Sequence, residues 1–174
     1  VSKAFAVESN DLITGVRLAG AAFSQAGGDL NEFLAIFTAI RSQTRESAES
    51  IGTGLKTIFG RLQNPVNIEA LRNFGIELRD LEGNFVGPLA AVQEIQRVIG
   101  NINPRSSDFG AVVKIIGGDR QISRTIPLIK EAAAQAEILA TAQQAVGSVG
   151  KEVGIAQEDL GVRLVQLGKN FKNL

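Results

Sequence analysis

The sequence contains no cysteine, no histidine and no methionine. Without cysteine the chain forms no disulfide framework and no thiolate metal site, and it offers no thiol nucleophile. Without histidine it lacks the side chain that most often serves as a general base or a metal ligand. Because methionine is absent, we expect that Val1 is not a translated start and that the chain is a window of a longer protein. These absences predict a non-enzyme with no catalytic, cofactor-binding or metal-binding residues.

An excess of charge of one sign is also missing, since 18 basic residues balance 18 acidic ones. A net charge near zero gives no electrostatic signature of a nucleic-acid or anionic-membrane partner. No uncharged apolar run reaches the roughly 20 residues of a membrane-spanning helix. The nearest, Ile126–Ala142, is interrupted by Lys130, Glu131 and Glu137. The hydrophobic content of 44% is typical of a soluble globular protein.

Apolar residues instead recur with the period of an amphipathic helix along most of the chain. The stripes expected to face a core are Leu12, Val16, Ala19 and Phe23; Leu30, Phe33, Leu34, Phe37 and Ile40; Ala48, Ile51, Leu55, Ile58, Phe59 and Leu62; Leu89, Val92, Ile95 and Ile99; and Phe109, Val112, Val113 and Ile116. We also expect a short helix around Ile68–Asn73, a long one from Gln121 to Ala145, and a last one over 150–174.

Capping residues, glycine and proline separate these helices. Asp29 is the expected N-cap of the second helix and Thr44 that of the third, while Ser106 or Ser107 caps the helix that contains Phe109. One uninterrupted helix of this length would reach about 260 Å at 1.5 Å per residue. The breaks therefore predict a chain that folds back on itself.

Glycines inside the third helix need a separate explanation. Each of them disfavours a helix by roughly 1 kcal/mol relative to alanine. The glycines are Gly52, Gly54 and Gly60. They indicate either that a neighbouring helix packs closely there or that this helix is not rigid.

The pattern changes ahead of Pro88. Ile76 and Leu78 alternate with charged residues, and Glu82–Asn84 is typical of a turn. We therefore predict a mainly α fold, a helical bundle of about seven to eight short-to-medium helices with one small β-hairpin near 76–86. Residues 1–174 are expected to be a single helical segment, with a sub-boundary near 100–107 and a terminal helix over 150–174 that projects.

Pairs of carboxylates are the remaining candidates for acid–base chemistry. The pairs are Glu46 with Glu49, Asp80 with Glu82, and Glu158 with Asp159. They fall at helix starts, in the expected turn and on a polar helix face. We interpret them as capping or solvated residues.

Two glycine-containing stretches are partly similar to anion-binding loops. Gly52–Thr57 lacks the glycine directly before lysine that a phosphate loop requires, and it continues an amphipathic helix. Ile116–Gln121 has the glycines of an anion-binding nest. Asp119 places a negative charge there, however, which favours a helix C-cap followed by the start of the next helix.

Scattered arginines are the only candidates for a DNA-facing surface. They are Arg41, Arg45, Arg72, Arg120 and Arg124. No aromatic platform accompanies them, and nearby acidic residues match them in number. A mixed-charge solvated face is the favoured interpretation.

The run Arg45–Leu62 closely resembles the signature helix in the core region of phage tail tape measure proteins. In that family an Ile-Gly-Thr pattern, here at Ile51, precedes a Lys-Thr-Ile-Phe-x-Arg run, here at Lys56. The order of later landmarks is also similar: Gly75, Ile76, Asp80, Gly83 and Phe85, then the helix Leu89–Ile99, then a Gly-x-Arg-Gln turn at Gly118–Gln121. The resemblance covers most of positions 25–150.

The resemblance implies a structural protein of a bacteriophage tail, whose chain length sets tail length during assembly and which is released at DNA ejection. It implies a location in the tube lumen or tail tip of the virion, and in the host cytoplasm during assembly. The implied partners are copies of itself, the tail tube protein, baseplate and tail-tip proteins and tail assembly chaperones, with phage DNA and the host membrane at ejection. It implies no cofactor.

Two other functions remain open. Glycine-rich amphipathic helices and the alanine-rich Gln121–Ala145 are consistent with a membrane-active segment that aids genome delivery across the host envelope. The arginines alone motivate the other alternative, a DNA-binding helical module.

Overall fold

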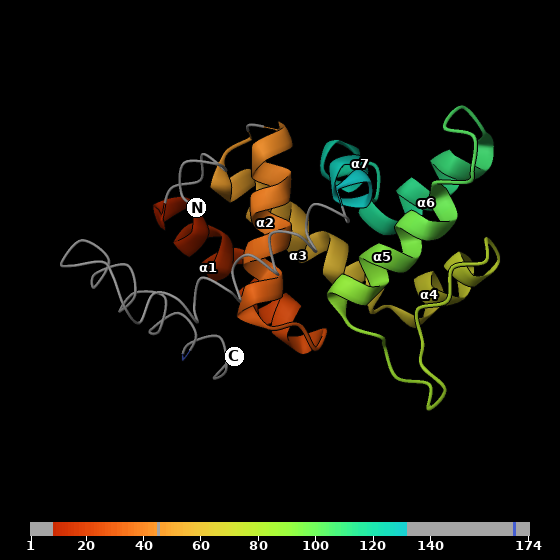
Figure 1. Cartoon of the computed structure of the whole chain (residues 1–174), viewed down its shortest axis with the longest axis horizontal. Helices are drawn as coiled ribbons and strands as arrows, with labels where there is room; N and C mark the ends of the chain where they lie inside the picture. Colours follow the sequence, from red (N-terminus) through yellow and green to blue (C-terminus); the bar gives the residue numbers. More distant parts are fainter. Residues whose placement is uncertain (1–8, 45, 132–168, 170–174) are drawn as a thin grey trace, which may run out of the picture.

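A computed structural model of the protein describes residues 9–44, 46–131 and 169. Within these residues the chain forms seven helices: α1 (Ser9–Gln25), α2 (Leu30–Thr44), α3 (Ala48–Leu62), α4 (Pro65–Arg72), α5 (Pro88–Ile99), α6 (Ser107–Gly117) and α7 (Ile122–Lys130). Figure 1 shows α1–α3 on one side and α4–α6 on the other, with α7 between them. In agreement with this view, α7 contacts α2, α3, α5 and α6. The predicted mainly α fold class is confirmed.

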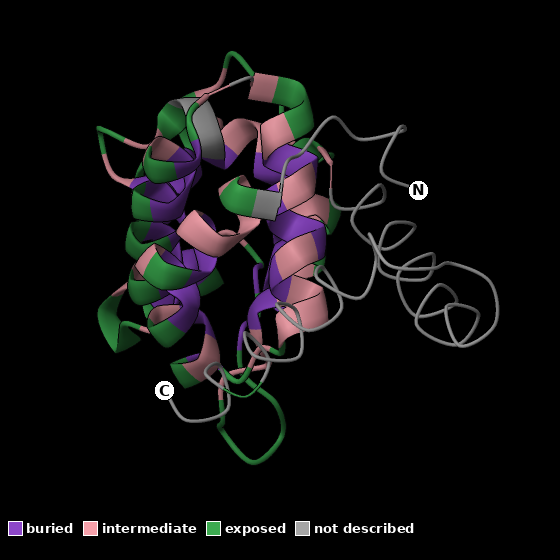
Figure 2. Ribbon diagram, turned by 90° about the vertical axis from the view of Figure 1, so that its left-hand side faces the viewer, coloured by how far each residue is buried: buried purple, intermediate pink, exposed green. Residues whose placement is uncertain are grey.

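The central element is α3, which contacts α1, α2, α4, α6 and α7. Its predicted apolar stripe is fully buried, and the buried residues of the other helices also face the interior (Figure 2). The α3 residues in this face are Ala48, Ile51, Gly52, Gly54, Leu55, Ile58, Phe59 and Leu62. Burying a large aliphatic or aromatic side chain stabilises a fold by about 1.5–3 kcal/mol.

Four buried phenylalanine rings join the first three helices. The ring centroid of Phe23 in α1 lies 5.4 Å from that of Phe33 in α2 and 4.9 Å from that of Phe59 in α3, and both contacts are edge-to-face. Phe33 also stacks on Phe37, at 5.9 Å. Such pairs contribute about 0.5–1.5 kcal/mol beyond the burial of their surface. The three helices therefore share one aromatic centre.

A glycine-to-glycine crossing brings α1 and α3 close together. A Cβ placed on Gly52 would lie 3.0 Å from the Cβ of Leu18 and 3.4 Å from the Cα of Gly15. A Cβ on Gly15 would overlap the ring of Phe37 in α2. The close neighbour predicted from the α3 glycines is thus present at Gly52. At Gly60 it is not, because a Cβ there would meet nothing within 4 Å.

Reciprocal hydrogen bonds cap α2 where the sequence predicts its start. The Glu32 N–H donates to Asp29 Oδ1 at 2.9 Å, and the Asp29 N–H donates to Glu32 Oε2 at 3.2 Å. This is a capping box, which satisfies backbone donors that the helix itself leaves without acceptors. Burial raises the pKa of Glu32, although the Asp29 N–H acts in the opposite direction.

Two other helix starts are also set by side-chain caps. Ser106, one of the two predicted caps of α6, accepts a hydrogen bond from the Phe109 N–H at 3.2 Å. Asn64 accepts one from the Val66 N–H at 2.9 Å and places Pro65 at the first position of α4. Proline suits that position because its missing N–H would have no helical acceptor there. This helix therefore begins earlier than the predicted Ile68–Asn73.

The β-hairpin predicted near 76–86 is wrong. Among the described residues the only β-pairing is an isolated antiparallel bridge between Arg79 and Phe85. The segment after the turn is too short to form a second strand. Gly87 adopts a φ of 93°, and Pro88, which has no N–H to donate to a strand, already begins α5. The alternating apolar residues are buried all the same, by packing in the helical core: Ile76 and Leu78.

The long helix predicted from Gln121 to Ala145 is described only in its first part, as α7. The rest of it lies outside the described residues, as do the helix and projection predicted over 150–174, of which only Lys169 is described. In the part of the chain that the structure covers, no helix is both long enough and apolar enough to span a bilayer.

Ile58→Asp tests the assignment of the buried face of α3. The substitution places a charge without a partner at a fully buried position, so we expect the free energy of unfolding to fall by about 3 kcal/mol or more. Urea denaturation measures this loss. Thr57→Asp is the matched control on the exposed face, with an expected loss below about 1 kcal/mol. Equal losses in the two variants would contradict the assignment.

Substitutions at two glycines of α3 are expected to change stability in opposite directions. Gly60→Ala fills open space inside a helix and should stabilise the protein by about 0.5–1 kcal/mol. Gly52→Ala meets Leu18 and the backbone of α1, so it should destabilise by about 1 kcal/mol or more. Thermal unfolding should show changes of opposite sign. A gain in both variants would mean that α1 and α3 separate easily.

Candidate functional site

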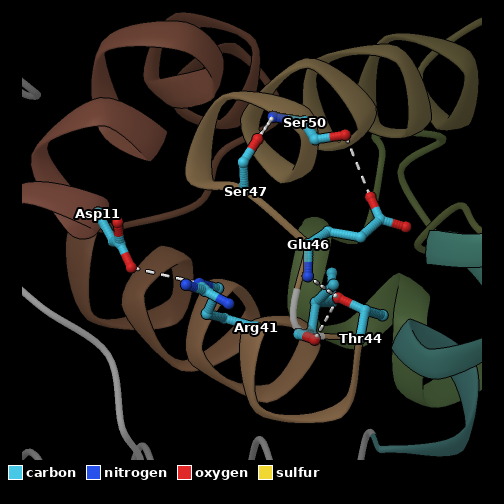
Figure 3. Close-up of polar contacts among 7 residues, drawn as sticks. Asp11, Arg41, Thr44, Glu46, Ser47 and Ser50 are labelled. Atoms are coloured by element: carbon cyan, nitrogen blue, oxygen red, sulfur yellow. Dashed lines mark hydrogen bonds and ion pairs between the residues drawn. The ribbon is translucent and has the colours of Figure 1, made fainter.

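The connection between α2 and α3 is held by polar contacts at the start of the Arg45–Leu62 run (Figure 3). Ser47 is the N-cap of α3, and its Oγ accepts the Ser50 N–H at 3.2 Å. The Ser50 hydroxyl donates to the Glu46 carboxylate at 3.2 Å. The prediction that Thr44 caps α3 is wrong, because Thr44 is the last residue of α2 and its Oγ1 accepts the Glu46 N–H instead, at 3.3 Å.

Two of the arginines considered for a DNA-facing surface are paired with carboxylates. Arg41 Nε donates to Asp11 Oδ2 at 3.2 Å, which joins α2 to α1 (Figure 3). Arg72 Nε lies 3.2 Å from Glu77 Oε2. Partners of opposite charge reduce the positive potential that DNA binding requires. The structure does not describe Arg45 or the side chain of Arg124.

Arg61, in the last turn of α3, contacts the C-terminal end of α6. Its Nε donates to the Ile115 carbonyl at 2.9 Å and its Nη2 to the Lys114 carbonyl at 3.2 Å. The Gly118 N–H donates to the same Lys114 carbonyl at 2.8 Å. Carbonyls at a helix C-terminus carry partial negative charge, so a guanidinium there is stabilising. The contact joins residues that are 53 and 54 positions apart.

This contact brings two of the sequence landmarks together. Arg61 belongs to the Lys-Thr-Ile-Phe-x-Arg run, and Gly118 begins the Gly-x-Arg-Gln turn. Gly118 has a φ of 66°, which confirms that the glycines after Ile116 form a helix C-cap. Asp119 does not cap α7; its carboxylate lies 3.0 Å from Lys114 Nζ. The end of α6 is therefore a set of carbonyl acceptors, which favours cations over anions.

The connection between α4 and α5 contains a hydrogen-bonded turn at residues 80–84. Asp80 Oδ1 accepts the Asn84 N–H at 2.7 Å, and the Asp80 N–H donates to the Asn84 carbonyl at 2.9 Å. The Asn84 N–H bond is the largest of the interactions that lower the pKa of the Asp80 carboxyl. Arg79 Nη1 donates to the Gly83 carbonyl at 2.6 Å. The turn role predicted for the Asp80 carboxylate is confirmed.

The other carboxylate pairs serve no shared site in the described residues. Glu46 accepts the hydrogen bond from Ser50 described above, and Glu49 lies in the first turn of α3. Glu158 and Asp159 lie outside the described residues. Over the ranges that the structure covers, no three acidic side chains gather in a way that would hold a metal ion. What the geometry offers is helix packing and exposed surface.

Comparison with known proteins adds a decisive observation. Residues 1–117 match the family model described as phage-related minor tail protein. The chain belongs to this family. The match ends at Gly117, the last residue of α6, so it includes both sides of the Arg61 contact. No solved structure matches the chain significantly.

Membership of the minor tail protein family confirms the phage tail origin that the resemblance implied. A minor tail protein is a structural part of the virion tail and works alongside other tail proteins. The predicted location in the phage tail and the predicted structural role are thus confirmed at the level of the minor tail protein family.

Arg61→Ala tests whether the contact with α6 stabilises this minor tail protein. Loss of two charge-assisted hydrogen bonds should lower the free energy of unfolding by about 1–2 kcal/mol. Arg61→Lys should recover only part of that loss, because an ammonium lacks the planar fork that reaches both carbonyls. Arg72→Ala is the control, since Arg72 also ends a helix but is 62% exposed and should contribute less than about 1 kcal/mol. Equal effects at both positions would contradict the role of Arg61.

Proposed function

We propose that this chain is the folded core segment of a tail tape measure protein, which sets tail length during assembly and is released at DNA ejection. The observation that carries the proposal is the contact of Arg61 with the end of α6. Two stretches that resemble the tape measure family, far apart in sequence, form one packed unit. Because the two stretches pack against each other, each has a physical reason to occur in the same protein as the other.

The segment itself does not measure. A measuring element must lengthen in proportion to its residues, at about 1.5 Å per residue if it is helical. Here the helices fold back on one another around α3, so added residues would not add length in this way. We therefore assign the measuring to other parts of a longer chain. The segment described here would be a packed body that meets the tail tube protein, tail-tip and baseplate proteins or the assembly chaperones.

No enzymatic step belongs to this proposal. Histidine and cysteine, which most often serve as general base and thiol nucleophile, do not occur in the sequence, and we interpret the carboxylate pairs as capping or solvated residues. Of the two alternatives, the DNA-binding module is the less favoured, because Arg41 and Arg72 are paired with carboxylates. The membrane-active alternative depends on Gln121–Ala145, which the structure describes only as far as Glu131.

The test is the length of tails made by phage that carry changes in the parent gene. In-frame deletions within extended helical regions outside this segment should shorten tails by about 1.5 Å per deleted residue. Ile58→Asp should instead reduce the number of assembled tails, because it unfolds the body, while tails that do form keep their length. Electron microscopy of negatively stained particles measures both quantities.

Thr57→Asp phage are the control and should assemble normally. Tails of unchanged length after the in-frame deletions would overturn the tape measure proposal. Tails shortened by Ile58→Asp would show that this body takes part in measuring.

A further inference from the structure

Helix α7 lies between the two groups of helices and touches both of them (Figure 1). It contacts α2 and α3 in one group and α5 and α6 in the other. The buried residues described in it are Thr125, Leu128 and Ile129, which share one face of the helix. The buried face of α3, the other helix that joins the groups, is longer and runs from Ala48 to Leu62. Helix α7 therefore joins the groups through fewer buried residues than α3 does.

Little within α7 itself keeps it helical. An isolated helix shorter than about 12–15 residues is marginal in water, and α7 runs only from Ile122 to Lys130. Pro127 lies inside it and has no N–H to donate to the carbonyl of Ser123, four positions earlier. No side chain caps the start of the helix. The helical form of α7 thus depends on packing against its neighbours.

The connection before α7 contains a pair of glycines that can act as a pivot. Gly117 is the last residue of α6, and Gly118 adopts a φ of 66°. Glycine accepts a wide range of backbone conformations, so rotation here strains no side chain. Arg61 binds the carbonyls of Lys114 and Ile115 just before the pivot and so holds α6 against α3. Rotation about the two glycines therefore moves α7 and leaves α6 in place.

The hydrogen bonds of α7 also allow it to leave its neighbours. Thr125 is fully buried, but its hydroxyl donates to the Gln121 carbonyl at 2.8 Å, one turn earlier in the chain. This bond moves with α7, so opening does not incur the penalty of an unsatisfied buried polar group at Thr125. The bond from Gln96 Nε2 in α5 to the Lys130 carbonyl is exposed and 3.3 Å long, so water can replace it.

We propose that α7 is a strap that swings away about Gly117 and Gly118 while α1–α6 stay folded. In the open state the apolar surface that α7 covers becomes accessible, and the two groups of helices are joined mainly through α3. The residues that match the minor tail protein family end at Gly117, on the same boundary. This inference concerns the fold, and it stands whether or not the chain is part of a tape measure protein.

Hydrogen–deuterium exchange of the 174-residue chain tests the strap directly. We expect the protection factors of the α7 amides to be at least about tenfold lower than those of the α3 amides. The α6 amides should stay more protected than those of α7, because α6 lies on the fixed side of the pivot. Low urea should accelerate exchange in α3 but not in α7, since opening a strap exposes far less surface than unfolding does.

Thiol labelling of single-cysteine variants gives a second measurement, because the chain has no cysteine of its own. Leu128→Cys places a thiol on the buried face of α7. Leu55→Cys is the matched control in α3, since the two leucines are 1% and 0% exposed. A thiol at position 128 should react at least about tenfold faster than one at position 55. Circular dichroism should show that both variants are folded.

An engineered disulfide across the pivot should hold the strap closed. A Cβ on Gly117 would lie 3.2 Å from the Thr125 Cβ, slightly below the roughly 3.5–4.5 Å of a disulfide. A chain with Gly117→Cys and Thr125→Cys can therefore be oxidised across the two glycines. Oxidation should slow exchange of the α7 amides at least about tenfold, with a smaller effect on the α3 amides. The same chain in its reduced form is the control.

Several results would overturn the proposal. These are equal protection of α7 and α3 in the unchanged chain, equal labelling rates at positions 128 and 55, and a disulfide that protects both helices to the same extent. Exchange of α6 as fast as that of α7 would place the pivot elsewhere and would equally reject the strap proposed here.

Discussion

Burial of one face of α3 is the interaction that holds both groups of helices together. This helix alone contacts α1 and α2 on one side and α4 and α6 on the other, and it also contacts α7. Its large apolar residues are removed from water completely, so each contributes on the scale of a kilocalorie or more. The aromatic centre around Phe23 and the Arg61 contact with α6 both extend from this helix. Helix α7, which contacts α2, α5 and α6, is the second element that bridges the two groups.

The helices were predictable because one side of each packs on a common core. Burial on one side imposes the 3.6-residue period that the sequence shows, and the residues of the α3 stripe are those that the structure buries. The segment at 76–86 was misread for a related reason. Alternating apolar residues mark any extended chain with one face buried, and Ile76 and Leu78 are buried in the helical core without a partner strand. A period of two identifies extended backbone, but it does not identify what covers it.

The candidate site was less predictable than the fold. A basic residue in the last turn of a helix is ordinary, so nothing local in the sequence distinguishes Arg61 from Arg72. The difference is that Arg61 lies beside the end of α6, and this depends on how two distant helices pack. Family resemblance supplied the order of the landmarks but not their contact. The exposure of Leu81 was also missed, because an apolar residue in an expected hairpin gives no sign of pointing outward. The N-cap at Ser47, by contrast, could have been predicted from the sequence, since serine is among the preferred N-cap residues.

The crossing of Gly15 and Gly52 has a consequence for how this sequence changes over generations. Three helices meet there, because the ring of Phe37 fills the space in front of Gly15 while the Leu18 side chain and the backbone of α1 fill the space in front of Gly52. A larger residue at either glycine displaces α1 or the ring, and a smaller residue at position 37 leaves a void. We therefore expect substitutions at positions 15, 37 and 52 to be accepted only in combination. Substitutions at exposed glycines such as Gly60 should be accepted independently.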